Sequence, residues 1–169
     1  GVAYALFQMA SIDIADKDYQ QALTRLNEAL PQFKSAAAHP MEAQSRLSMV
    51  SVYLGTDKLD NALSQLEAAT SIINTLTNDE LHQTLHEHWS DYYQRIGNYE
   101  AALKHYKMSV NFMQKVQQQT RDKQVQEIMV RLEIKEQETT NELLKKETEL
   151  QQLELQEQQT SYYLLIWII

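Results

Sequence analysis

The sequence predicts an all-helical (all-α) protein in which three helical hairpins stack into a solenoid and a long C-terminal helix follows them. Three observations support this fold class. Gly occurs only 3 times and Pro only 2 times in 169 residues, and both weaken helix interiors. One short pattern occurs three times at a constant interval along the chain. Residues 121–160 contain no aromatic residue, Gly or Pro and are dominated by Glu, Gln, Lys and Leu, which is typical of a long solvated helix.

The repeat centres on Ala22, Ala62 and Ala102, within the aligned segments 18–23, 58–63 and 98–103. Large apolar residues recur thirteen positions before each alanine, large residues four positions after it, and small residues seven positions after it. The aligned sets are Met9, Met49 and Trp89; Leu26, Leu66 and Tyr106; and Ala29, Ala69 and Ser109. Small residues let paired helices approach closely, and large residues fill the space between stacked hairpins.

The repeat and the helix-start signals together place the elements. Helices are expected at about residues 3–15, 18–36, 40–55, 58–76, 79–96 and 99–117. Pro40 suits a first helical turn, and Thr77 or Asn78 suits a cap. We therefore assign residues 1–117 to the solenoid, 118–160 to a long polar, coiled-coil-like helix and 161–169 to a short apolar segment.

The repeat resembles that of the tetratricopeptide-repeat (TPR) family, which has a small residue and a Tyr on the first helix, then Gly-Asp-Tyr and two alanines on the second helix. The third unit matches best, through Trp89, Ser90, Tyr93, Gly97, Asn98, Tyr99, Ala102 and Ser109. The second unit keeps Tyr53 but has Asp57 at the Gly position, and the first has Asp13 at the Tyr position. The period here is about 40 residues and the family's usual period is about 34, so the surplus is expected between units, at 37–42 and 77–82.

The long polar helix has two interpretations. A broken heptad seam consists of Val125, Met129, Leu132, Glu136, Thr139, Leu143, Lys146, Leu150, Leu153 and Glu157. About half of these positions are polar, so a parallel coiled coil would be weak by itself. In one interpretation the seam pairs two copies, making the full-length protein a homodimer. In the other, one patch of the helix packs on the repeats.

The chain ends with eight uncharged apolar or aromatic residues, 162–169. A transmembrane helix needs about 20 apolar residues, so this segment is too short to span a bilayer alone. It resembles the first two turns of such a helix, and we expect a truncated transmembrane helix. A core segment docking on the repeats and an amphipathic surface anchor are the alternatives.

TPR units, a Glu/Lys/Gln-rich helix and a transmembrane helix together resemble the sensory half of bacterial membrane signalling proteins. Residues 131–136 and 143–155 are similar to the juxtamembrane segment of that family. The resemblance implies a sensory input module of a receptor whose output domain is a diguanylate cyclase (GGDEF) or histidine kinase. It also implies the extracytoplasmic, periplasmic face of a bacterial inner membrane, with a C-terminal anchor. The alternative function is a soluble TPR scaffold that mediates protein–protein interactions.

Composition excludes several function classes. A net charge of -8 and the lack of a basic stripe argue against nucleic-acid partners. Without Cys there is no thiolate nucleophile or Cys-based zinc site. No phosphate-binding loop, His-Glu-x-x-His motif or nucleophile elbow is present, so we expect no catalysis and no cofactor. His82 and His86 have a spacing that can hold a metal, but we interpret them as exposed or packing histidines and expect no metal site.

The concave groove of a TPR stack is lined by the first helix of each unit. Position matching gives the candidate ligand-binding residues Phe7, Ser11, Ile14, Leu47, Ser48, Ser51, Glu87, His88, Asp91 and Arg95. This lining is apolar in the first two units and polar in the third, which suits a peptide, a protein segment or a small amphipathic ligand. The groove lacks the Lys/Asn set with which chaperone-binding TPR proteins hold a carboxylate. Packing of this surface on a further N-terminal repeat is the alternative.

Overall fold

The computed structural model describes the backbone of residues 1–167 and the side chains up to Ser161, together with that of Tyr163. Within this range the protein is all-helical, with no strand, which confirms the predicted fold class. The helices are α1 (Val2–Ala15), α2 (Tyr19–Ser35), α3 (His39–Gly55), α4 (Leu59–Ile73), α5 (Asp79–Arg95) and α6 (Tyr99–Trp167). The chain divides into a compact unit from Gly1 to Gln118 and a second unit that begins at Gln119.

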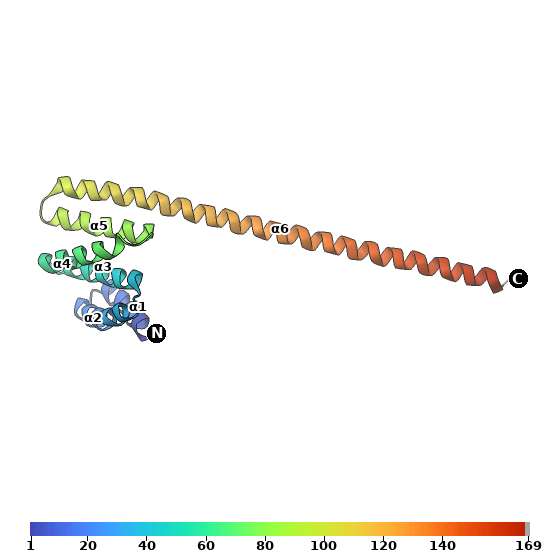
Figure 1. Ribbon diagram of the computed structural model, residues 1–169, viewed down its shortest axis with the longest axis horizontal. Coiled ribbons are helices and arrows are strands. Elements are labelled where there is room, and N and C mark those ends of the chain that lie inside the picture. The colour runs from blue at the N-terminus through green and yellow to red at the C-terminus, as the bar shows by residue number, and fades with distance from the viewer. Residues whose placement is uncertain (168–169) are drawn as a thin grey trace. The chain divides into compact units, whose positions relative to one another are not determined.

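The first unit consists of helices packed in successive neighbouring pairs (Figure 1). Helix α1 packs on α2, and α3 packs on α4. The third pair is α5 with the first turns of α6, where the Ser90 hydroxyl donates to the Ala102 carbonyl at 3.0 Å. Adjacent pairs are joined by packing of α2 on α3 and of α4 on α5. The first helices of the pairs also contact one another, α1 with α3 and α3 with α5.

The core lies where the repeat predicts it. Ala22, Ala62, Leu26 and Leu66 have no exposed surface, which agrees with small residues at the close helix crossings and large ones between them. The third pair departs from this pattern, because Tyr106 occupies the position of the two buried leucines and is 57% exposed.

A left-handed residue ends the first helix of every pair at the same register position. Lys17, Asp57 and Gly97 have φ values of 64°, 57° and 78°. The amide of the residue after each one donates to the carbonyl five positions earlier, at 2.8, 2.8 and 2.9 Å. This is the Schellman ending, which satisfies carbonyls that the helix leaves unpaired. The turns therefore recur with the period of the sequence repeat, although their residue types differ.

The helix starts follow local capping. Asn78 is the N-cap of α5, and its side-chain oxygen accepts from the Leu81 amide at 3.0 Å, which confirms the predicted cap. Asp18 caps α2 in the same way, accepting from the Gln21 amide at 3.2 Å. Pro40 lies in the first turn of α3, where a missing N–H costs nothing.

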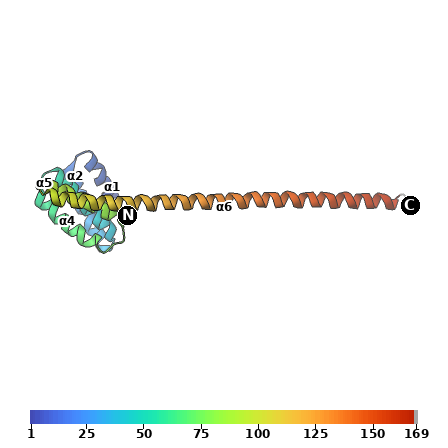
Figure 2. The same ribbon diagram turned by 90° about the horizontal axis from the view of Figure 1, so that it is seen from above.

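Two boundaries differ from the prediction. Helix α4 ends at Ile73, three residues before the expected end at 76. Helix α6 is one continuous helix, whereas the prediction divided it into a solenoid helix at 99–117 and a separate long helix at 118–160 (Figures 1 and 2). The connecting residues 117–121 are three glutamines, a threonine and an arginine, and Gln and Arg are good helix formers. The backbone can therefore continue through them.

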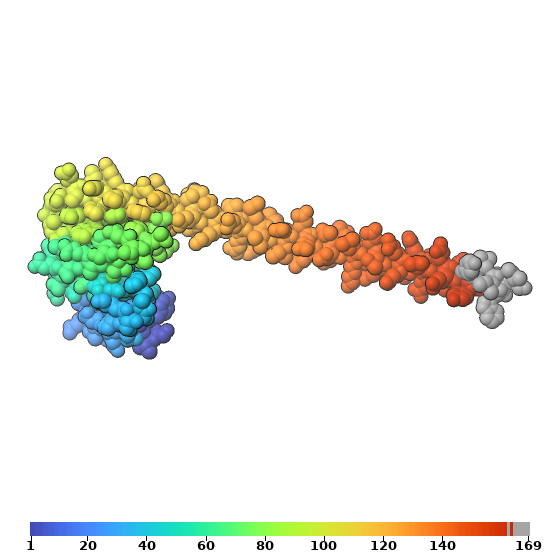
Figure 3. Space-filling model, in the orientation of Figure 1, coloured from blue at the N-terminus to red at the C-terminus, as the bar shows by residue number. Residues whose placement is uncertain are grey.

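The second unit is part of the single helix α6. All its described side chains from Gln119 to Ser161 are exposed, including those of the predicted seam (Figure 3). Arg131 and Glu127 form an ion pair at 3.3 Å one turn apart, and both side chains are largely exposed. Such pairs support a solvated helix by only a few tenths of a kcal/mol (about 0.3–0.5).

The predicted transmembrane anchor is wrong for the residues that the structure describes. None of their helices contains a stretch that is apolar enough, over a sufficient length, to cross a bilayer. Residues 168 and 169 of the predicted anchor segment lie outside the described range. The predicted location at the periplasmic face of an inner membrane depended on this anchor and is not supported.

Candidate binding groove

Two helices present matching stripes of side chains on the surface of the first unit. Helical residues spaced by four, three and four positions lie on one face. The stripe on α3 is Gln44, Ser48, Ser51 and Gly55, and the stripe on α5 is Thr84, His88, Asp91 and Arg95. Each α5 residue follows its α3 counterpart by one full repeat, so the repeat places both stripes on the same side of the hairpin stack.

These stripes line two adjoining hollows. One has a volume of about 350 Å³ and extends from α5 across α3 to Phe7 on α1. The other has a volume of about 380 Å³ and lies between the C-terminal halves of α3 and α5. Ser51 and His88 line both. The two hollows therefore adjoin at these two residues, and we refer to them together as the groove, whose lining comes from the first helices of all three pairs.

The junction of the hollows has a defined polar geometry. The Ser51 hydroxyl lies 3.4 Å from His88 Nε2 and also donates to the Leu47 carbonyl at 3.3 Å. Burial lowers the pKa of His88 below its ordinary value, against the opposing charges of Asp91 and Glu87. Because the single hydroxyl proton of Ser51 is used on the Leu47 carbonyl, the N–H of a neutral His88 ring lies on Nε2 and points to Ser51 Oγ, and Nδ1 is left as an acceptor for a peptide N–H.

The α5 end of the groove is charged. Asp91, Gln94 and Arg95 line it, and Arg95 Nη1 lies 3.9 Å from an oxygen of Asp57. That ion pair is loose and solvent-exposed, with 44% and 83% of the two side chains exposed. An exposed pair of this kind contributes little stability, so both charges remain able to contact a ligand.

The structure brings seven of the ten sequence-predicted residues into the groove. They are Phe7, Leu47, Ser48, Ser51, His88, Asp91 and Arg95. Ser11, Ile14 and Glu87 do not line either hollow. The Ser11 hydroxyl donates to the Phe7 carbonyl, Ile14 packs against the buried cluster around Leu26, and Glu87 accepts from Gln83.

Position matching missed other lining residues. These are Gln44, Leu54, Gly55, Glu80, Leu81, Thr84 and Gln94. The repeat contains the signal for most of them. Gln44 and Thr84 lie one turn before the recognised pair Ser48 and His88, and both pairs are separated by one repeat.

The histidines gather on another surface, between α5 and α6. His82 and His86 lie one turn apart as predicted, and His105 of α6 joins them, with Nδ1 of His86 and of His105 3.0 Å apart. Phe112 stacks on His82 and His86 at centroid distances of 4.9 and 5.6 Å. Among the described residues, no group of three or more His, Cys, Asp or Glu is placed to hold a metal ion.

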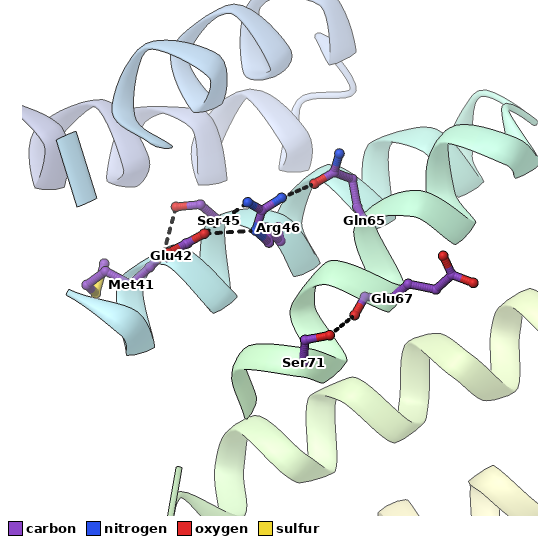
Figure 4. A network of polar contacts seen from close by, with 7 residues as sticks. All are labelled: Met41, Glu42, Ser45, Arg46, Gln65, Glu67 and Ser71. Atoms are coloured by element: carbon purple, nitrogen blue, oxygen red, sulfur yellow. Dashed lines mark hydrogen bonds and ion pairs between the residues drawn. The ribbon is translucent and has the colours of Figure 1, made fainter. Parts of the chain in front are cut away.

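The equivalent positions in the α3–α4 pair indicate the role of the histidines. At the three equivalent positions, one repeat earlier, are Glu42, Arg46 and Gln65 (Figure 4). Arg46 donates to Glu42 at 2.9 Å and to Gln65 of α4 at 2.9 Å, and the Arg46 and Glu42 side chains are only 12% and 8% exposed. These positions therefore connect the two helices of a pair, through an ionic network in one pair and through stacked rings in the next. The histidines take a packing role.

Comparisons of the sequence with models of protein families and with curated proteins found no match. The assignment to the TPR family therefore stays a prediction, and the helical-hairpin architecture is what the structure shows.

Proposed function

We propose that this protein is a scaffold that binds an extended peptide segment of a partner protein in the groove across α1, α3 and α5. The observation that carries the proposal is that the two hollows of the groove adjoin, since Ser51 and His88 line both of them. A groove that crosses three helices fits a chain segment better than a compact ligand.

The lining favours a peptide over an apolar small molecule. Pockets for small ligands are usually lined mostly by hydrophobic side chains. Here apolar and polar groups share the lining, with Phe7, Leu47, Leu54 and Leu81 beside hydroxyl, amide, imidazole and charged groups. Such a surface can pair with peptide N–H and C=O groups and accept one or two apolar side chains.

The receptor hypothesis is the alternative, and it requires an output domain in addition to the groove. The scaffold needs only the groove and a stack of hairpins that holds it rigid. The scaffold function is also among those that the TPR resemblance implies. Like the receptor hypothesis, it expects this chain to bind a partner and not to catalyse a reaction.

The test is a selection from a random library of displayed peptides of about twelve residues on the purified protein, with affinities then measured by fluorescence anisotropy. Ser48→Trp fills the groove floor, and Gln44→Trp blocks it at an exposed position. Ser71→Trp on the exposed surface of α4 is the matched control. We expect each groove variant to weaken selected peptides at least about tenfold, or about 1.4 kcal/mol, and the control to leave affinity within about twofold.

Circular dichroism of each variant shows whether it has kept its helices. The proposal fails if no peptide is enriched. It also fails if enriched peptides bind the folded Gln44→Trp and Ser71→Trp variants equally well.

A further inference from the structure

The hairpins of the first unit are joined by two complementary faces. The leading face is on the first helix of a pair, at the position shared by Met9, Met49 and Trp89 and at that shared by Ile12, Val52 and Tyr92. The trailing face is on the second helix, at the position shared by Leu23, Leu63 and Leu103 and at that shared by Leu26, Leu66 and Tyr106.

Contacts inside the chain show that these faces meet. Met49 on α3 belongs to one buried cluster with Leu26 on α2. Trp89 on α5 donates its indole N–H to Thr70 on α4 at 3.0 Å. The same joint thus occurs twice, with the leading face of a later pair seated on the trailing face of the earlier one.

Burial at the joints is nearly complete. Met49, Val52, Leu26 and Leu66 are at most 1% exposed, and Tyr92 is 8% exposed. Leu23 and Leu63 are partly buried against the same clusters. Large apolar side chains at these positions are therefore adapted to a helix that covers them.

Among the described residues, the same positions are uncovered on α1 and on the first turns of α6. On the leading face of α1, Met9 is 45% and Ile12 is 61% exposed. On the trailing face of α6, Leu103 is 53% and Tyr106 is 57% exposed. Helix α6 is the last described helix of the chain, so no other described helix follows it.

We propose that the trailing face of one copy of this protein binds the leading face of a second copy, so that copies stack head to tail. The new joint would repeat the two joints inside the chain, with Met9 and Ile12 taking the places of Met49 and Val52 on the Leu103 and Tyr106 face. Such an interface joins two different surfaces and does not close on itself. Assembly should therefore grow with protein concentration, independently of any ligand in the groove.

Two substitutions separate the two halves of the joint. Met9→Asp places a charge on the leading face, and Tyr106→Asp places one on the trailing face. We expect the unmodified protein to form concentration-dependent oligomers in analytical ultracentrifugation and each variant alone to be monomeric. An equimolar mixture should form a heterodimer, because each variant supplies the face that the other lacks.

Matched controls carry the same charge on neighbouring exposed positions. Tyr4→Asp lies on α1 at the register of the groove stripe, and Met108→Asp lies on another face of α6. Both should self-associate like the unmodified protein. Circular dichroism checks that each variant is folded. We expect all four to fold, because all four positions are exposed.

Three results would overturn the proposal. If the unmodified protein stays monomeric over the concentration series, the proposed interface between copies does not form. Loss of association with Tyr106→Asp but not with Met9→Asp would indicate two trailing faces paired symmetrically. Association that survives both substitutions would place the contact elsewhere, for example on the 125–157 seam of α6.

Discussion

Leu66→Ala tests the packing between stacked hairpins directly. Leu66 on α4 has no exposed surface and belongs to the largest buried cluster, which also contains Ala62, Ile73 and Leu85. The substitution removes three carbons, which at about 0.8 kcal/mol each amounts to about 2.4 kcal/mol of lost burial. The cavity left behind adds to this, so we expect a loss of about 3 kcal/mol, within the observed range of about 2–5 for such changes.

The measurement is urea unfolding followed by circular dichroism. With a slope of about 2 kcal/mol per M, a loss of about 3 kcal/mol lowers the midpoint by about 1.5 M. Tyr106→Ala is the matched comparison, because it occupies the same register position and is 57% exposed. At low protein concentration it should cost about 1 kcal/mol or less.

A small loss at Leu66 would refute this account of the joint. So would equal losses at the two positions, because the difference in cost rests entirely on whether a following helix covers the side chain.

Three further predictions concern close packing, a turn and protonation. Ala62→Leu should lower the free energy of unfolding by about 1–3 kcal/mol through overpacking. Ser64→Leu, on the exposed side of α4, should change that free energy by less than about 0.5 kcal/mol. Equal melting temperatures for the two variants would show that the register is wrong. Gly97→Ala should cost about 1–2 kcal/mol in the same melts, because its φ is +78° and no atom lies within 4 Å of the added carbon, so the cost comes from the backbone alone. Burial, with His105 and His82 nearby, lowers the pKa of His86 from 6.5 to about 4, so the neutral form is favoured in the folded state and stability should fall as the pH falls from about 6.5 towards 4. His86→Gln should reduce this fall, and parallel melting-temperature curves for the two proteins between pH 7 and 4 would contradict it.

The fold was predictable because the repeat depends on residue size. Ala22 and Ala62 recur where helices cross closely, and Leu26 and Leu66 recur where hairpins stack. The constant offset between repeats places these positions in the core without any knowledge of the loops. The continuous α6 was harder to predict, since a change of composition near residue 118 resembles a boundary although the local residues favour helix.

The groove was predictable only in part. Leu47, Ser48 and Ser51 could be predicted from the register. They lie on α3, the first helix of its pair, at the positions that line the groove of a TPR stack. Glu87 has the same register as Leu47 yet does not line the groove. Sequence position fixes the direction of a side chain along its helix, but the path of the neighbouring helices decides which side chains reach a hollow. The transmembrane prediction relied on the resemblance of a few apolar residues to the start of a span, and no helix of the described residues is long and apolar enough to cross a membrane.

The left-handed turn positions bear on how the proposed peptide recognition could change over evolutionary time. At Lys17 and Asp57 the turn forms without glycine, held by the same backbone hydrogen bonds as at Gly97. A turn position that does not require glycine can carry a side chain that contacts a ligand. Asp57 illustrates this, because its carboxylate reaches Arg95 at the charged end of the groove from the turn of the preceding hairpin. Substitutions in the turns can thus alter the charge that a ligand meets while the helices and their packing stay the same.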